Sequence, residues 1–257
     1  MPRDQGCAER FGPLTLFVRL GPGWPYYARP VRGGGPVGAD DIEAVRDRQR
    51  TLGVPESFEW IDEVTPTMRA AAEKAGLRAI VHPLMALPPG AVPDHESAPN
   101  VRLIDPDEPD LARMQAVQMI AFGMPVTPST AEGYGDAADR DAMVPAVEAT
   151  ALELVRDRLR SGRMLLAGAF GAELEGPVAA GGCQILPPVA EIVGLGTLPA
   201  ARRRGLGTAV TATLATAALA RGAGTVFLSA ADDDAARLYG RLGFVRVGTS
   251  MVAGPAA

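Results

Sequence analysis

Residues 190–207 read AEIVGLGTLPAARRRGLG, an apolar segment followed by a turn rich in arginine and glycine. The apolar part, residues 191–198, is too short for a helix and too apolar for a surface loop, so we expect a buried strand. The strand must end at Pro199, because proline has no N–H to donate to a neighbouring strand. Apolar residues recur at helical spacing from Leu206 onward, which predicts that a helix begins there.

The turn between this strand and this helix has the features of an anion site. A helix N-terminus carries unpaired N–H groups and a partial positive charge. Glycines let a ligand approach the backbone closely, and the arginines of residues 202–207 (RRRGLG) add full charges. We therefore expect a diphosphate to bind here. Two common phosphate patterns do not fit, because a Walker loop needs a lysine before Thr208 and a dinucleotide fingerprint from Gly194 needs a glycine where Pro199 stands.

The sequence after this helix predicts three more elements. Residues 225–229 (TVFLS) are rich in strand-forming residues. Residues 232–242 predict a helix with three aspartates in its first turn, where the helix dipole favours negative charge. Gly243 ends that helix, and residues 245–252 predict a final strand.

Arg202, Gly205 and Gly207 form the pattern RxxGxG. Together with the elements that follow, this pattern resembles the acyl-CoA pyrophosphate loop and the second half of the GNAT superfamily of N-acyltransferases. The resemblance is specific over residues 190–244. Taken alone, the six-residue pattern also suits a basic turn that is exposed to solvent. The family usually has asparagine where Asp232 stands, which leaves a CoA contact of this residue open.

The resemblance implies an α+β fold with a mixed α/β sheet, the GNAT acyl-CoA N-acyltransferase fold, and acetyl-CoA as cosubstrate. In the family, backbone N–H groups freed where strands splay or bulge bind the pantetheine and the carbonyl oxygen; the matching residues here are Leu195, Gly196 and Thr197. The residues that would hold the pyrophosphate are Arg202, Arg203, Arg204, Gly205, Leu206, Gly207 and Thr208.

Glu191 is the candidate general base. In a regular strand, alternation places it on the same face as Val193, Leu195 and Thr197, so one carboxylate lies among apolar side chains. Such a carboxylate suits a base that takes a proton, directly or through water, from an alkylammonium. Family members often carry a base at this position relative to the arginine loop. The alternative is an exposed glutamate at the start of the strand, with no chemical role.

Tyr239 matches the tyrosine with which the family donates a proton to the CoA sulfur, and the rival interpretation is a buried structural tyrosine. Cys183, just before the central strand, could suggest an acyl-cysteine intermediate, but a small thiol in the core is the favoured interpretation. Cys7 is the other cysteine, and two histidines, His82 and His95, are too few for a zinc site. We therefore expect neither a disulfide nor a metal.

The first part of the chain repeats the same order of elements. Sliding it by 167 residues places Gly38 on Gly205 and Gly76 on Gly243. Gly35 then stands where the second copy has Arg202, so the CoA-binding chemistry is missing. This predicts an incomplete N-terminal GNAT-like half that completes a core or dimerises. An unrelated α/β extension is the alternative. The expected elements are a loose tail over 1–13, strands over 14–19, 24–29, 56–61 and 78–87, a helix from Asp40 or Asp41 to 52, and a helix from 65 to 77.

Residues 91–100 are rich in proline and polar residues and predict the domain boundary. We expect a degenerate GNAT-like half-domain over residues 1–100 and a GNAT N-acetyltransferase domain over residues 101–257. The second domain should contain a strand from residue 101, helices over 107–122 and 139–160 with an irregular segment over 123–135 between them, and a hairpin of strands 164–170 and 177–185.

Composition restricts the partners. The formal net charge of −5 disfavours nucleic acid, which needs a basic surface. No apolar run approaches the roughly 18 to 20 residues of a membrane span, and the N-terminus lacks the apolar region of a secretory signal. We expect a soluble, cytoplasmic protein without a membrane partner. The abundance of Ala, Gly, Pro and Arg resembles the coding bias of a GC-rich bacterium.

These observations predict an N-acetyltransferase that transfers the acetyl group of acetyl-CoA to a primary amine by direct attack. The alternative is a non-catalytic acyl-CoA-binding or interaction module, which the degenerate N-terminal repeat makes conceivable. The sequence leaves the acceptor open among a small metabolite, an antibiotic, a peptide N-terminus and a protein lysine. It also leaves a homodimer open.

Overall fold

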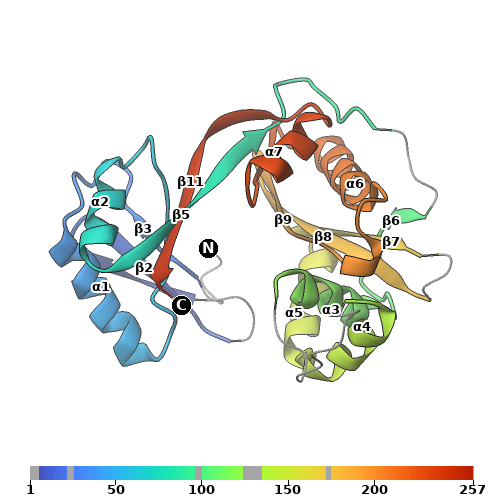
Figure 1. Cartoon of the computed structure of the whole chain (residues 1–257), viewed down its shortest axis with the longest axis horizontal. Coiled ribbons are helices and arrows are strands. Elements are labelled where there is room, and N and C mark those ends of the chain that lie inside the picture. The colour runs from blue at the N-terminus through green and yellow to red at the C-terminus, as the bar shows by residue number, and fades with distance from the viewer. Residues whose placement is uncertain (1–5, 22–25, 96–99, 124–134, 172–174, 257) are drawn as a thin grey trace. The chain divides into compact units, whose positions relative to one another are not determined.

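The computed structural model describes residues 6–21, 26–95, 100–123, 135–171 and 175–256 (Figure 1). The chain forms two compact units, each with helices packed on a mixed sheet, which confirms the expected α+β fold. Unit 1 comprises Met1–Leu84, Ser229–Asp233 and Arg246–Ala257, and unit 2 comprises Met85–Leu228 and Asp234–Val245. The expected division cuts the chain once, at residue 100. Each observed unit instead combines stretches that are separated in the sequence.

The sheet of unit 1 has the strand order β1-β2-β3-β4-β11-β5. Pairing is parallel between β3 and β4 and antiparallel in the pairs β1–β2, β2–β3 and β4–β11. Buried residues of its strands and helices, among them Leu14, Ile42 and Met251, form its core. Its elements are β1 (Gly6–Phe11), β2 (Leu14–Arg19), β3 (Ala28–Pro30), α1 (Ala39–Leu52), β4 (Phe58–Ile61), α2 (Thr67–Lys74), β5 (Leu77–Ala86) and β11 (Val245–Pro255).

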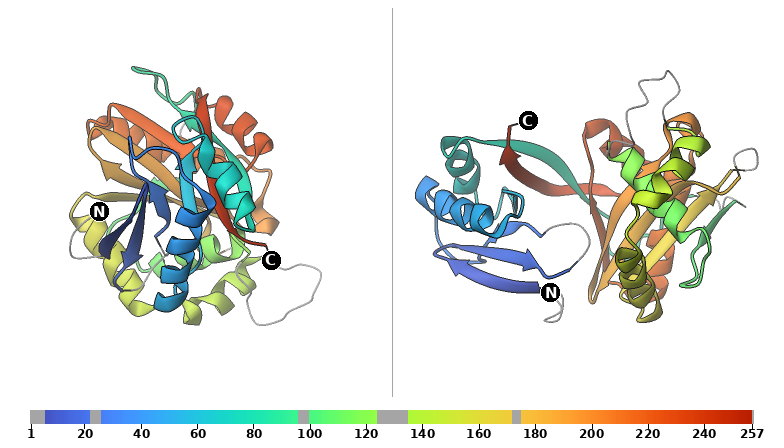
Figure 2. Two further views of the ribbon diagram at one scale, coloured as in Figure 1. Left: turned by 90° about the vertical axis from the view of Figure 1, so that its left-hand side faces the viewer. Right: turned by 90° about the horizontal axis from the view of Figure 1, so that it is seen from below.

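The expectation of a loose N-terminal tail is wrong from residue 6 onward. Strand β1 pairs with β2 along its whole length, from Gly6 opposite Arg19 to Phe11 opposite Leu14, and Figure 2 shows this hairpin in blue. Most side chains of β1 are exposed or half-buried, so its sequence lacks the apolar alternation that identifies a strand. Its place in the sheet depends on β2, which the sequence of β1 alone does not reveal.

Helix α1 begins differently from the expected cap at Asp40 or Asp41. Its N-cap is Gly38, and the carboxylate of Asp41 accepts a 2.9 Å hydrogen bond from the N–H of Gly38. Asp41 therefore satisfies a terminal N–H from inside the first turn instead of from the cap position.

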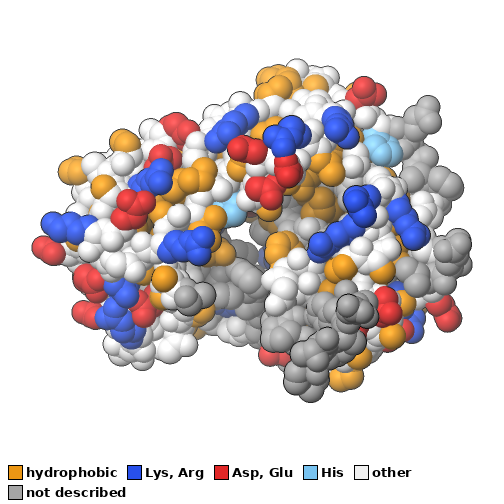
Figure 3. Space-filling view, viewed as in Figure 1, with side chains coloured by type: hydrophobic (Ala, Val, Ile, Leu, Met, Phe, Trp, Pro, Cys, Tyr) orange, Lys and Arg blue, Asp and Glu red, His pale blue; other side chains and the backbone are white. Residues whose placement is uncertain are grey.

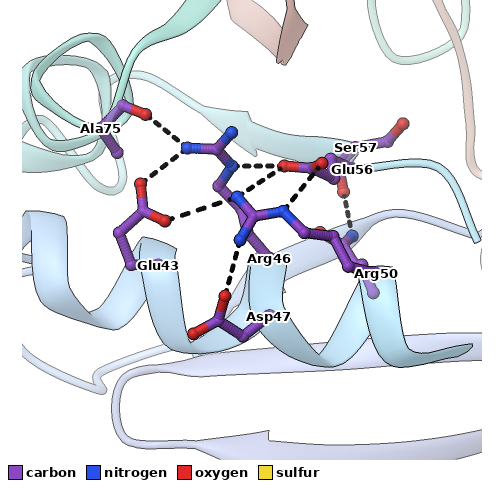
Figure 4. Close-up of polar contacts among 8 residues, drawn as sticks. Glu43, Arg46, Asp47, Arg50, Glu56, Ser57 and Ala75 are labelled. Carbon is purple, nitrogen blue, oxygen red and sulfur yellow. Dashed lines mark hydrogen bonds and ion pairs between the residues drawn. The ribbon is translucent and has the colours of Figure 1, made fainter.

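An ion-pair cluster ties α1 to the elements that follow it (Figure 4). Arg46, whose side chain is 15% exposed, donates to Glu43 at 2.6 Å, to Glu56 at 2.5 Å and to the carbonyl of Ala75 at 2.5 Å. Burial alone would raise the pKa of Glu56, but hydrogen bonds from Arg46 and Arg50 outweigh it and hold that pKa below its usual value. One guanidinium thus joins α1, the end of α2 and the segment that leads into β4.

The sheet of unit 2 has the strand order β10-β9-β8-β7-β6. Strands β6 to β9 pair antiparallel with their neighbours, and β9 pairs parallel with β10. Helix α3 lies on one face of this sheet and α6 on the other (Figure 1). The elements are β6 (Val101–Leu103), α3 (Leu111–Ala121), α4 (Ala137–Met143), η1 (Val144–Ala146), α5 (Ala149–Arg160), β7 (Met164–Phe170), β8 (Pro177–Leu186), β9 (Val189–Thr197), η2 (Pro199–Ala201), α6 (Leu206–Ala220), β10 (Thr225–Ser229) and α7 (Asp233–Gly240).

The single helix expected over residues 139–160 is wrong. The structure has α4, the short η1 and α5 instead, with Pro145 inside η1. Proline removes an N–H and collides with the preceding turn, so a continuous helix cannot pass this position. The hairpin of β7 and β8 is confirmed. Parts of five expectations lie outside the described residues, namely the tail at 1–13, the strand at 24–29, the boundary at 91–100, the irregular segment at 123–135 and the turn between the two strands of the hairpin.

The elements of the two halves correspond at nearly constant spacing. Helix α1 begins at residue 39 and α6 at 206, and β4 begins at 58 and β10 at 225. Helices α2 and α7 begin at 67 and 233, and strands β5 and β11 begin at 77 and 245, so all four offsets lie between 166 and 168. The internal half-repeat stays a proposal, which this correspondence supports.

Two surface properties bear on the expected partners. Within the described part of the chain, no helix is long and apolar enough to cross a membrane. Basic and acidic side chains are interspersed over the face that Figure 3 shows.

Candidate functional site

The arginine-rich turn lies between β9 and α6, and both elements occur where the sequence predicts them. The turn begins with η2 and continues through Arg202, whose Nε donates to the carbonyl of Thr197 at 3.3 Å. Gly205 is the N-cap of α6, and this cap position makes no side-chain hydrogen bond to the helix. The side chains of residues 202–204 are exposed.

Two residues of this turn have left-handed backbone conformations, Arg203 with φ of 60° and Gly205 with φ of 75°. Among the described residues other than glycine, Arg203 is the one with a positive φ. An arginine pays about 1–2 kcal/mol for this conformation, and such strain often marks a functional position. Left-handed residues in a turn aim successive N–H groups into one concavity, which binds anions.

The two glycines of the pattern have different structural roles. A Cβ at Gly205 would meet no atom within 4 Å, so the backbone at the helix N-terminus is open to a ligand. A Cβ at Gly207 would lie 3.5 Å from Oγ1 of Thr197 and 3.9 Å from Cδ2 of Leu195. A Cβ at Gly207 would thus make ordinary contacts with the end of β9, beside which the first turn of α6 lies.

Strand β9 contains a β-bulge at Gly194 and Leu195. Pairing with β8 shifts there, from Val193 opposite Gly182 to Gly196 opposite Ala180, so two residues of β9 oppose the single residue Gly181. Gly194 has a φ of 62°, as expected for the first residue of a bulge of the glycine type. A bulge of this kind turns peptide groups away from the neighbouring strand. The resemblance to the GNAT superfamily implied such freed N–H groups at this strand.

The bulge corrects the predicted faces of β9. Glu191 and Val193 do share a face, since they oppose alternate residues of β8. Leu195, however, lies on the other face of the sheet. A Cβ added to Gly181 would meet the side chain of Leu195 there, together with those of Val210 and Leu214 of α6. The placement of Leu195 and Thr197 on the face of Glu191 is therefore wrong, because the extra residue reverses the alternation.

Glu191 lies where β9 and β10 separate. The described pairing between these strands runs from Val189 opposite Thr225 to Glu191 opposite Phe227, whereas β9 continues to Thr197. The side chain of Glu191 is half-buried. Glu191 is therefore the last paired residue of β9 before the two strands separate, on the same strand as the bulge.

Tyr239 belongs to α7 and is half-buried. Its ring meets the ring of Phe244 edge to face, with 6.3 Å between the centroids and 62° between the planes. Asp232, which precedes α7, is exposed and belongs to unit 1, whereas the other predicted site residues belong to unit 2. Glu191 and the bulge thus lie on β9, and the arginine turn lies in the loop that follows this strand.

A protein-family model described as the acetyltransferase (GNAT) family matches residues 139–244. This range contains the bulge, Glu191, the arginine turn and Tyr239. Residues 139–244 form a GNAT acetyltransferase domain.

Several solved structures share this fold over most of the chain. A GCN5-related N-acetyltransferase from Kribbella flavida is 22% identical, with a TM-score of 0.69, covering 99% of this chain and 91% of that one. A putative GNAT acetyltransferase from Novosphingobium aromaticivorans is 20% identical, with a TM-score of 0.54 and coverage of 96% and 90%. A GCN5-related N-acetyltransferase from Sphaerobacter thermophilus is 20% identical, with a TM-score of 0.56 and coverage of 84% and 67%. Among curated proteins, no match is found.

Gln118 is a residue beside the bulge that the sequence did not single out. It lies on α3, and its Nε2 donates to the carbonyl of Gly194 at 2.6 Å. The available signal was a glutamine among the apolar residues of α3, next to Val117 and close to Ile120. That pattern does not reveal the partner, because the partner lies 76 positions further along the chain.

Cys183 is fully buried in β8. Burial raises the pKa of its thiol to about 12, and the charge of Glu191 adds to this effect. Since the nucleophile in thiol chemistry is the thiolate, this environment disfavours an acyl-cysteine. Among the residues that the structure describes, no group of three or more His, Cys, Asp or Glu could hold a metal ion.

The N-terminal counterpart of the GNAT turn has the opposite charge. The first turn of α1 contains Asp40 and Asp41, and the carboxylate of Asp41 already accepts from the N–H of Gly38. The N–H of Val37 donates to Oγ1 of Thr67 at 2.9 Å. The N–H groups of Val37 and Gly38 thus have internal partners, and the two carboxylates of the first turn repel phosphate.

Proposed function

We propose that unit 2 transfers the acetyl group of acetyl-CoA to a primary amine by direct attack. The observation that carries the proposal is the turn over residues 202–208, which joins three exposed arginines, two left-handed residues and an uncapped helix N-terminus. A coenzyme A diphosphate fits this combination of backbone donors and charge.

Acetyl-CoA supplies an activated acetyl thioester when it is bound. On this proposal, Arg203 and Arg204 pair with its diphosphate together with the N–H groups of Leu206 to Thr208. N–H groups of the bulge hold the acetyl carbonyl oxygen, where negative charge develops during acyl transfer. The bulge and the turn lie at one end of β9, so the same strand positions both.

Glu191 takes the proton that the amine must lose, directly or through a water molecule. Its half-buried position at the separation of β9 and β10 supports this role, because an incoming amine can reach a group at a strand opening. The raised pKa of the Cys183 thiol leaves direct attack as the favoured route over an acyl-cysteine.

Tyr239 donates a hydrogen bond or a proton to the departing sulfur. Its edge-to-face contact with Phe244 fixes the ring on α7. The phenol is a weak acid, so hydrogen bonding to the sulfur forms part of its effect.

A non-catalytic acyl-CoA-binding module is the second candidate, because the arginine turn alone would suffice for it. The acceptor on the first proposal is a small-molecule or peptide amine. Calorimetry with acetyl-CoA and thiol detection with a panel of amines separate the two candidates. Binding with CoA release that depends on one class of amine supports the enzyme, whereas tight binding without release from any amine supports the module. Absence of binding contradicts both.

A further inference from the structure

The side chain of Gln118 contacts the bulge at its turning point. Its Nε2 lies 2.6 Å from the carbonyl oxygen of Gly194, a short hydrogen bond between α3 and β9. Its Oε1 accepts from Nε2 of Gln115 at 3.0 Å. Both ends of the amide thus have partners, and the carbonyl of Gly194, which can only accept, requires the nitrogen end to face it.

Close packing holds Gln118 in this place. A Cβ on Gly194 would lie 2.7 Å from Nε2 of Gln118, and a Cβ on Gly196 would lie 2.6 Å from Cβ of Ala121 and 3.4 Å from Cα of Gln118. A side chain at Gly196 would push α3 away, and a side chain at Gly194 would displace the amide of Gln118. The two glycines therefore allow α3 to approach the bulge closely enough for a direct hydrogen bond.

The hydrogen bond fixes more than the carbonyl of Gly194. The peptide group between Gly194 and Leu195 is planar and trans, so the N–H of Leu195 points opposite to the carbonyl that Gln118 holds. Gly194 could adopt other conformations, since glycine is the most permissive residue. The hydrogen bond from Gln118 to the carbonyl of Gly194 selects one of these conformations. It thereby also sets the direction of the N–H of Leu195.

We propose that Gln118 is a positioning residue that sets the peptide between Gly194 and Leu195 so that the N–H of Leu195 faces the acetyl carbonyl oxygen. This inference rests on the proposed function, in which the bulge binds that oxygen. Gln118 does not touch the reacting atoms itself. A preorganised donor costs no reorientation during the reaction, which is how such groups lower a barrier.

The test uses two variants. Gln118→Met keeps the length of the side chain but has no hydrogen-bond donor, and Gln118→Glu keeps its shape but replaces the donating amide with a carboxylate, which accepts. Removal of one such donor lowers kcat about 10²–10³-fold in other enzymes, and we expect about 10- to 100-fold here because the donor is misaligned, not deleted. The affinity for CoA, which lacks the acetyl group, and the melting temperature should change little. Gln115→Met makes the same substitution one turn earlier and leaves the bond to Gly194 in place, so its kcat should fall less than about threefold.

A second measurement does not depend on the acceptor amine. The ratio of the dissociation constants of CoA and acetyl-CoA reports contacts to the acetyl group, and both Gln118 variants should lower it toward one. Unchanged kcat and an unchanged ratio in both variants, or an equal loss in Gln115→Met, would overturn the inference. A wild-type protein that releases no CoA with any amine contradicts the proposed function instead, and the ratio then decides the role of Gln118.

Discussion

Arg203 combines a charge with an unfavourable backbone conformation. Arg203→Gly removes the charge and adopts the left-handed conformation without strain, so the fold of the turn should survive. Loss of one charged contact to the diphosphate should weaken acetyl-CoA binding about tenfold. Calorimetry measures this change. Arg32→Gly, an exposed arginine in the loop of the N-terminal counterpart, is the matched control and should leave the affinity as it is.

Glu191 and Tyr239 should fail in different ways. Glu191→Gln cannot take up the ammonium proton, so turnover should fall about 10²- to 10⁴-fold with little change in acetyl-CoA affinity. This loss should shrink as the pH rises, because more of the amine is then already neutral. Tyr239→Phe removes the donor at the sulfur, and its defect should persist or grow at high pH. Profiles of rate against pH with one active amine distinguish them, and parallel profiles would remove Glu191 from the mechanism.

At the scale of elements, the bulge in β9 shows how one inserted residue redirects a strand. Before Gly194, alternate side chains of β9 follow the predicted faces, and after it Leu195 packs on the side of α6. The same insertion turns a peptide group toward α3, where Gln118 meets it. On our proposal, the bulge thereby supplies a backbone donor.

The α1 cluster gives an element-scale prediction about pH. The folded-state pKa of Glu56 lies below its usual value of 4.5, so its ion pairs stabilise the fold above that value. Their contribution is lost as the pH falls through the lower folded-state pKa. Glu56→Gln should cost about 1 kcal/mol of unfolding free energy at pH 7, and this deficit should vanish at acid pH.

Denaturant unfolding of wild type and Glu56→Gln at several pH values measures this difference. Glu43→Gln is the matched control, since Glu43 is 44% exposed and also pairs with Arg46. Its cost should be smaller, because an exposed ion pair contributes little. A Glu56→Gln deficit that stays constant down to acid pH would contradict the assignment.

For the whole molecule, the two halves should differ in ligand binding. The turn before α6 has three arginines, whereas the first turn of α1 has two aspartates and the N–H groups of Val37 and Gly38 just before it have internal partners. We expect one acetyl-CoA per chain. Titration calorimetry with a known protein concentration gives the number of sites, and two equivalents per chain would contradict a degenerate N-terminal half.

The sequence by itself determined the features that depend on near neighbours. Strand β9, the arginine turn and α6 follow from an apolar run, a proline, glycines and helical spacing within about 30 residues. These signals suffice because backbone conformation and helix periodicity are local. They also predicted Glu191 and the turn as site residues, whose chemistry awaits the measurements above.

Only the tertiary structure decided which distant residues meet. The bulge requires Gly181 opposite two residues of β9, and Gln118 reaches Gly194 from another element. Strand β1 forms because β2 pairs with it, and most of β11 joins unit 1 because it pairs with β4. In each case the stabilising partner is fixed by hydrogen bonds and packing between separate elements. Patterns within one segment carry no information about such partners.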